Sequence, residues 1–342
     1  MINKENDNHP KIGLALSGGS ALGMAHIGVI KSLTENHILI DCVSGTSAGA
    51  IAAACLAFEV PLEKMIEISK KINWSNISEF GYSKFGLNSN KPISEMIIEI
   101  MGDVKIEDAK IPLAIVATNI DTGEEVIFHK GNLTEAIMAS TCLPGIFVPV
   151  EVKGKRLVDG GLIENLPLSP LKKMGAKIRI GVNLKHWNNY KKTSNVFDVI
   201  SNSYNILSRS QDYSIANQAE IIIEPRLEKF DSSDFEKFDA LLEEGYKASN
   251  RMIPKIKRYL NQDISNQNSF FQKIANFFKP KTKMNEENKF KQKNDIPAEK
   301  EQTKAKAREL IPTWLGLAIA FLVLAGLFLL FTKFKSITTL VQ

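Results

Sequence analysis

The chain of 342 residues has only three cysteines, Cys42, Cys55 and Cys142, and none of them stands in CxxC spacing. An odd, scattered set of thiols excludes a disulfide framework and a zinc knuckle, and it fits a reducing compartment. The first residues, MINKENDNHPK, lack the apolar run that a secretory signal needs. We therefore expect neither a signal peptide nor a cysteine-based metal site.

A basic face is also lacking. The net charge is +5, but residues 271–310 alone hold eleven Lys or Arg against six Asp or Glu, and Lys333 and Lys335 add two more positive charges. Residues 1–270 are therefore mildly acidic. This distribution argues against nucleic acid as a partner.

Charge disappears completely between Glu309 and Lys333. Roughly 20 apolar residues in a helix span about 30 Å of hydrocarbon, and Trp314 stands where an interfacial aromatic residue belongs. The sequence predicts a single transmembrane helix over residues 311–332, followed by a short tail over 333–342. A buried core helix is the other interpretation, but a core helix of this length normally has a polar face.

The charges that flank this segment predict its orientation. Lys304, Lys306 and Arg308 precede it closely, so the positive-inside rule places the preceding domain in the cytoplasm. Residues 261–310 form an amphipathic segment and then a basic, flexible linker. The apolar stripe within 270–278 either caps the globular core or lies on a lipid surface, and both interpretations stay open.

Residues 11–260 alternate between apolar strand patterns and helical patterns, after a polar tail over residues 1–10. Alternation of this kind predicts an α/β fold with a mostly parallel central sheet flanked by helices. The expected strands are 11–18, 39–45, 111–121, 124–130, 155–161 and 177–184, and the expected helices are 21–37, 47–59, 133–144 and 168–176. The stretch from about 190 to 260 is expected to be helical.

The motif Gly45-Thr46-Ser47-Ala48-Gly49 lies between an apolar strand pattern and an alanine-rich helix. A GxSxG motif at such a junction is typical of a nucleophile elbow, in which small neighbours allow a tight turn that exposes the serine hydroxyl. The alternative is a helix N-cap in which Ser47 only accepts a backbone N–H.

A glycine-rich loop over residues 17–23 follows the first expected strand. The exposed N–H groups of Gly18, Gly19 and Ser20 suit an anion, either a dinucleotide phosphate or an oxyanion. The spacing is not GxGxxG, and no acidic residue ends the next strand as a nucleotide site requires. With Ser47 present, the pattern favours an oxyanion hole.

A nucleophilic serine needs a base, and two arrangements are open. Asp159, which ends a short strand before Gly160 and Gly161, could accept the proton directly. Alternatively His186, which follows both Ser47 and Asp159, would complete the chain order of an α/β-hydrolase triad. We expect His26 to pack in the core and His37 to be exposed, and His129 ends an expected strand beside Lys130.

Together, the three motifs in this order resemble the patatin-like phospholipase family, in its bacterial branch. The resemblance rests on ALSGGSALGMAHIGVI, VSGTSAGAI, ASTCLPGIFVPV and LVDGGLIENLPL, and it covers roughly residues 11–185. It implies a Ser47–Asp159 dyad, an oxyanion hole at Gly18, Gly19 and Ser20, an acyl-ester substrate and no metal or cofactor. Leu22 stands where many members carry arginine, so charge assistance from this loop is not expected.

The resulting hypothesis is a membrane-tethered lipid acyl hydrolase of the phospholipase or lysophospholipase type, acting in lipid degradation. One alternative is a hydrolase of soluble esters or thioesters that uses the same dyad. The other is a catalytically inactive membrane scaffold.

Overall fold

The structure, a computed structural model, describes residues 11–83, 85–184, 193, 199–200, 202–204, 206–207 and 218–278. The predicted tail 1–10, most of the basic linker, the predicted membrane helix 311–332 and the tail 333–342 lie outside these residues. So does His186. Within the part that the structure describes, no helix is both long and apolar enough to cross a membrane.

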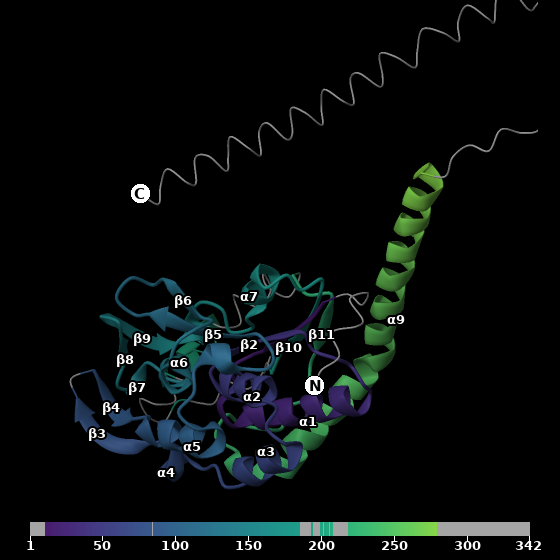
Figure 1. Cartoon of the computed structure of the whole chain (residues 1–342). Helices are drawn as coiled ribbons and strands as arrows, with labels where there is room; N and C mark the ends of the chain where they lie inside the picture. The colour runs from purple at the N-terminus through teal and green to yellow at the C-terminus, as the bar shows by residue number, and fades with distance from the viewer. Residues whose placement is uncertain are drawn as a thin grey trace, which may run out of the picture. The chain divides into compact units, whose positions relative to one another are not determined.

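Eight strands form the central sheet, in the order β11-β10-β1-β2-β5-β9-β8, with β6 paired to β5 (Figure 1). Their bounds are β1 Ile12–Leu16, β2 Cys42–Thr46, β5 Leu113–Asn119, β6 Glu125–Phe128, β8 Val150–Val152, β9 Lys155–Asp159, β10 Ile178–Val182 and β11 Ile221–Ile223. A smaller sheet combines β3 Glu79–Ser83, β4 Gly86–Ser89 and β7 Gly145–Phe147.

The pairing of the central sheet is mixed. The neighbours from β11 to β5 are parallel, as the alternating pattern predicts, whereas β6, β9 and β8 run antiparallel to their partners. The prediction of a mostly parallel sheet is therefore right for one half of the sheet. β11 was missed because its apolar run, Ile221–Ile223, is too short to stand out in a polar stretch.

Helices cover both faces of the sheet. They are α1 Met24–Glu35, α2 Ala48–Ala57, α3 Leu62–Ser69, α4 Trp74–Ile77, α5 Lys91–Met101, α6 Leu133–Ser140, α7 Leu168–Lys173 and α9 Phe238–Phe278. Short 3-10 turns lie at η1 Ser20–Gly23, η2 Ile106–Asp108, η3 Gly160–Leu162 and η4 Phe235–Lys237.

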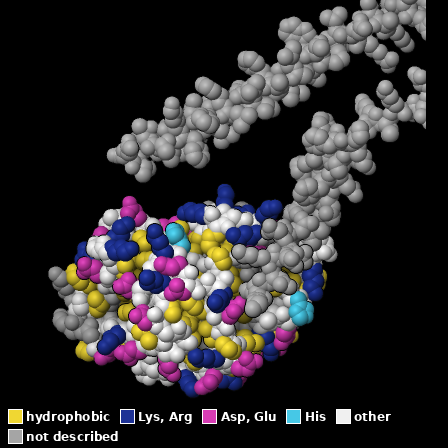
Figure 2. Space-filling model, in the orientation of Figure 1, with side chains coloured by type: hydrophobic (Ala, Val, Ile, Leu, Met, Phe, Trp, Pro, Cys, Tyr) yellow, Lys and Arg dark blue, Asp and Glu magenta, His cyan; other side chains and the backbone are white. Residues whose placement is uncertain are grey.

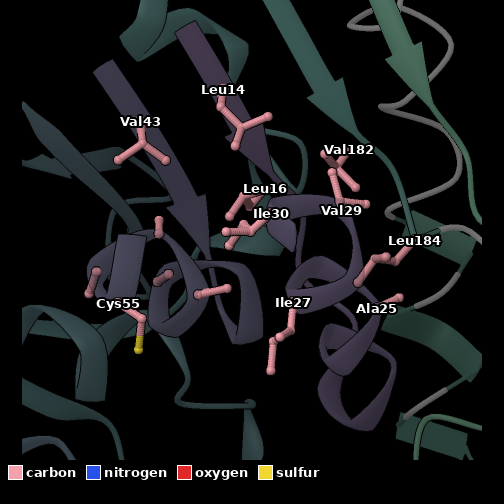
Figure 3. Close-up of a cluster of buried hydrophobic side chains, with 14 of the residues drawn as sticks. Leu14, Leu16, Ala25, Ile27, Val29, Ile30, Val43, Cys55, Val182 and Leu184 are labelled. Carbon is pink, nitrogen blue, oxygen red and sulfur yellow. The ribbon is translucent and has the colours of Figure 1, made fainter. Parts of the chain in front are cut away.

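The alternation of side chains along β1 separates two apolar layers. Leu14 and Leu16 belong to the large core that includes α1 and α2, whereas Ala15 lies in a second cluster with Leu168 and Leu171 of α7. Figure 3 shows strand side chains such as Leu14 and Val43 together with Ile27 and Ile30 of α1. Successive residues of a strand point to opposite faces, so both faces are buried.

The long helix α9 packs closely on α1 through two glycines. A Cβ atom on Gly28 would lie 1.9 Å from the carbonyl oxygen of Leu242, and one on Gly245 would lie 1.9 Å from that of Ala25. The stripe within 270–278 continues α9 in its backbone. The side chains of that stripe are outside the described set, so the choice between core and lipid stays open.

The surface in view in Figure 2 carries Lys and Arg side chains interspersed with Asp and Glu. Over this face, opposite charges are mixed rather than gathered into a basic patch, in keeping with the mildly acidic composition of residues 1–270.

Candidate active site

The ends of β2 and β9 meet along one edge of β5. Val116 of β5 pairs with Thr46, the last residue of β2, and the next residue, Ala117, pairs with Asp159, the last residue of β9. β2 runs parallel to β5 and β9 runs antiparallel to it, so the two strands approach each other head to head. This register brings Ser47, which follows Thr46, next to Asp159.

Ser47 occupies a strained turn. Its backbone has φ 54° and ψ −126°, a combination that residues other than glycine rarely adopt, and such strain typically costs about 1–3 kcal/mol. Ser47 stands at the N-cap position of α2 but makes no side-chain capping bond. The N-cap interpretation of this serine is therefore wrong, and its hydroxyl is left for another purpose.

The glycines of the elbow lie at close backbone contacts. A Cβ atom on Gly45 would stand 2.3 Å from the carbonyl oxygen of Gly49, and one on Gly49 would stand 2.2 Å from that of Leu16. The turn can therefore close against β1 only when both positions lack a side chain.

Ser140, at the end of α6, fixes the backbone of the elbow. Its Oγ accepts a hydrogen bond from the Ser47 N–H at 2.8 Å and donates one to the Val116 carbonyl at 2.6 Å. All three residues are buried. Nothing in the local sequence marks Ser140 as part of the site, because only the folded chain brings α6 to the elbow.

Asp159 is completely buried, and its two carboxylate oxygens have different environments. Oδ1 accepts hydrogen bonds from the Gly161 N–H at 2.8 Å and from the Tyr204 hydroxyl at 2.7 Å. Oδ2 has no partner in hydrogen-bonding geometry among the described residues, although the Ser47 hydroxyl is near enough to lower the carboxyl pKa.

Burial dominates the electrostatics of Asp159. It raises the pKa of the carboxyl to about 6, while the nearby Ser47 hydroxyl and the hydrogen bonds from Gly161 and Tyr204 oppose the increase. A carboxylate with this pKa is a stronger base than one in water and is still ionised at neutral pH.

The glycine-rich loop lies directly against the elbow. A Cβ atom on Gly18 would stand 3.1 Å from the Ser47 Cβ and 2.7 Å from Asn165 Oδ1. In this conformation the Gly18 N–H donates to the Asn165 carbonyl at 3.3 Å. Gly19 and Ser20 remain as possible oxyanion donors, and Ala48, the first residue of α2, offers a third N–H because helix-initial amides have no intrahelical partner.

No histidine of the described residues makes a hydrogen bond to Ser47 or Asp159. His26 is buried, donates from Nε2 to the Ser17 carbonyl at 2.8 Å, and has its pKa lowered to about 4 by burial. It packs in the core as predicted and stays neutral. His37 and His129 are exposed.

An apolar cavity of about 130 Å³ opens beside Ser47. Ser20, Gly23 and Ala48 line one part of it, and side chains of α1 to α5 and Phe147 of β7 line most of the rest. The apolar lining comprises, among others, Met24, Ile27, Ile51, Met65, Ile68, Ile72, Ile77, Ile93, Met96, Ile100 and Phe147. A cavity of similar size and lining, about 150 Å³, stays dry and binds apolar molecules.

Residues 14–172 match the family model described as patatin-like phospholipase. An uncharacterised NTE family protein of Mycobacterium tuberculosis is 35% identical over 178 residues, which is 51% of this chain and 49% of that protein. This stretch of the chain is a patatin-like phospholipase domain. The match contains Ser47 and Asp159 together with the glycine-rich loop.

Other relatives match over a larger share of the chain. The lysophospholipase NTE1 of Kluyveromyces lactis is 28% identical over 269 residues, covering 69% of this chain but 18% of that protein. The chain thus corresponds to about half the length of the mycobacterial relative and to a smaller part of the yeast one. Among solved structures, VipD from Legionella pneumophila shares the fold, with TM-score 0.50 and 15% identity over 72% of this chain and 67% of that one.

We expect Ser140→Ala to leave two buried groups, the Ser47 N–H and the Val116 carbonyl, without partners. The free energy of unfolding should fall by about 1–3 kcal/mol, and the rate at which a fluorophosphonate labels Ser47 should fall as well. Ser32→Ala is the matched control, because its buried hydroxyl donates to Asn250 Oδ1 at 3.0 Å away from the site. Labelling of Ser140→Ala at the wild-type rate would contradict a positioning role for Ser140.

We expect Asp159→Asn to stabilise the fold in a pH-dependent way. The pKa of Asp159 is higher in the folded chain than its ordinary value, so stability is lost as pH rises from about 4 to about 6 and stays lost above it. The neutral asparagine avoids this cost. Urea unfolding should give a gain of about 1–3 kcal/mol at pH 8 and clearly less at pH 4.5.

Asp121→Asn is the control for that measurement, since Asp121 is an exposed carboxylate in an ion pair with Arg156. It should show no such gain at pH 8. An equal effect of Asp159→Asn at the two pH values would contradict the charge argument.

Proposed function

We propose that the chain is a serine lipid acyl hydrolase of the phospholipase or lysophospholipase type. The observation that carries the proposal is the position of Ser47, a strained serine between the buried carboxylate of Asp159 and an apolar cavity. The match of residues 14–172 to the patatin-like phospholipase family and the similarity to a yeast lysophospholipase support it.

In the proposed reaction, Ser47 Oγ attacks the carbonyl carbon of an ester while Asp159 Oδ2 takes its proton. The negative charge that develops on the carbonyl oxygen needs preorganised donors, and the N–H groups of Gly19, Ser20 and Ala48 are suited to this role. Asp159 then returns the proton to the leaving alcohol oxygen, and an acyl-enzyme ester remains on Ser47.

Hydrolysis of the acyl-enzyme repeats this sequence with water as the nucleophile. Asp159 removes a proton from a water molecule, whose oxygen attacks the carbonyl carbon of the acyl-enzyme. Asp159 then returns the proton to Ser47 Oγ as the ester bond breaks, which releases the fatty acid and restores the Ser47 hydroxyl. A direct serine–aspartate dyad requires a base that is stronger than an ordinary carboxylate, and burial of Asp159 supplies it.

The apolar cavity supports an acyl chain as the group bound beside Ser47. Its lining consists mainly of Ile, Met and Ala side chains, which offer apolar contact and few hydrogen bonds. A chain whose carbonyl carbon lies at Ser47 can place its methylene groups among α3, α4 and α5. This arrangement favours lipid esters over small soluble esters.

We further propose that residues 311–332 anchor the protein in a membrane with the catalytic domain on the cytoplasmic side. The uncharged sequence and the flanking Lys and Arg residues support this. Anchoring would raise the local concentration of the enzyme at its lipid substrate.

The test is release of fatty acid by the full chain from mixed phospholipid vesicles. Ser47→Ala should reduce kcat by about 10⁶, the usual effect of removing a nucleophile, and Asp159→Asn should also abolish release, whereas His186→Ala should retain it. Ser32→Ala controls for the loss of a buried serine hydroxyl.

Other outcomes identify the alternatives. If His186→Ala loses activity while its fold is intact, the site is a Ser47–His186–Asp159 triad and not a Ser47–Asp159 dyad. Hydrolysis of soluble esters or thioesters with no release from vesicles would favour the soluble-substrate enzyme, and inactivity on all substrates would favour the scaffold.

A further inference from the structure

The two oxygens of the Asp159 carboxylate are used unequally. Oδ1 accepts hydrogen bonds from two donors, the Gly161 N–H and the Tyr204 hydroxyl, whereas Oδ2 is buried and has no hydrogen-bond partner among the described residues. Burial of a carboxylate oxygen without a hydrogen-bond donor destabilises the folded state, so such an atom commonly has a role in the site. In the proposed dyad, Oδ2 is the oxygen that takes the proton of Ser47.

The approach of Tyr204 to Asp159 depends on a glycine. A Cβ atom on Gly161 would stand 1.7 Å from the Tyr204 hydroxyl oxygen, so no other residue at position 161 leaves room for this hydrogen bond. Four residues earlier in the chain, Ile200 lies against a second glycine, with its Cδ1 3.2 Å from the Cβ position of Gly145.

We propose that Tyr204 is a positioning residue, which holds Asp159 through Oδ1 so that Oδ2 is directed at Ser47. The inference rests on the proposed function, and it adds a third member to the Ser47–Asp159 pair. In serine hydrolases a third group commonly orients the base. Here a tyrosine hydroxyl and a backbone N–H orient an aspartate.

The hydroxyl of Tyr204 is suited to be a permanent donor. Burial, followed by the nearby charge of Asp159, raises its pKa well above the ordinary tyrosine value, so it stays protonated throughout the working range. Its hydrogen bond stabilises the ionised carboxylate and thereby lowers the pKa of Asp159.

The other groups that face Asp159 do not titrate in the same range. They are the Ser47 hydroxyl, the Gly161 N–H and the thiol of Cys142, whose pKa is raised to about 12, mainly by burial. Glu164 has its pKa raised to about 7, mainly by burial and by Glu125, but its carboxylate binds Ser169 instead. Glu164→Gln therefore serves to identify any contribution from that group to the pH profile.

The experiment compares Tyr204→Phe with wild type in the pH dependence of two rates, ester hydrolysis and labelling of Ser47 by a long-chain fluorophosphonate. Wild type should show an acid limb near pH 6. Loss of a hydrogen bond to the carboxylate should move this limb about one unit higher, and poorer orientation should lower the plateau about tenfold. Tyr246→Phe is the matched control, since its hydroxyl donates to Glu35 on the surface at 2.7 Å.

Gly161→Ala tests the same hydrogen bond without altering the tyrosine. The new methyl group should displace the Tyr204 hydroxyl and reproduce the shift of the acid limb. In the double variant with Tyr204→Phe the two effects should not add, because both remove one interaction. If the effects of the two substitutions add, Gly161→Ala acts through something other than the Tyr204–Asp159 hydrogen bond.

The inference is overturned if Tyr204→Phe keeps the acid limb and the plateau of Tyr246→Phe while the fold of both is intact. Failure of the proposed function looks different, because wild type itself would then neither hydrolyse esters nor label. In that case, ¹³C NMR titration of the Asp159 carboxyl, assigned with Asp159→Asn, still decides: an unchanged pKa in Tyr204→Phe overturns the positioning role, and a raised pKa supports it.

Discussion

The shared edge of β5 is the constraint on which the site depends. β2 and β9 come from distant parts of the chain and run in opposite directions, yet their last residues pair with neighbouring positions, Val116 and Ala117. Two hydrogen bonds hold the end of β2 against the segment that follows Asp159. The hydroxyls of Ser44 and Thr46 donate to the carbonyls of Pro167 and Glu164 in that segment. The antiparallel half of the sheet is thus what delivers the base to the nucleophile.

Burial then gives Asp159 its chemical character. A carboxylate removed from water is a stronger base and also a cost to stability, and the donors on Oδ1 keep that cost within limits. The strained backbone of Ser47 is a second cost at the same place, offset by the hydrogen bond to Ser140 and by close packing of the elbow glycines. The large apolar core that packs against β1 and β2 stabilises the fold and so offsets both of these unfavourable contributions.

Much of this arrangement could be predicted from local patterns. The GxSxG motif, the glycine-rich loop and the apolar strand patterns lie within short stretches, and the structure places Ser47, Asp159 and Gly18 together. What could not be predicted depends on tertiary contact. Ser140 sits in an ordinary helical sequence, Tyr204 lies 45 positions from Asp159 with no motif around it, and the engagement of the Gly18 N–H by Asn165 follows from how two loops pack. β9 was expected as a strand, but its antiparallel pairing is set by register along β5, which local periodicity does not contain.

A crystal structure of the protein after reaction with a long-chain alkyl fluorophosphonate would test the proposed site most directly. We expect a bond from phosphorus to Ser47 Oγ, the phosphonyl oxygen within hydrogen-bonding distance of the N–H groups of Gly19, Ser20 or Ala48, and the alkyl chain in the apolar cavity. Asp159 Oδ2 should face Ser47 Oγ. An adduct on another residue, or an alkyl chain outside the cavity with the phosphonyl oxygen away from these donors, would show that the proposed site is wrong.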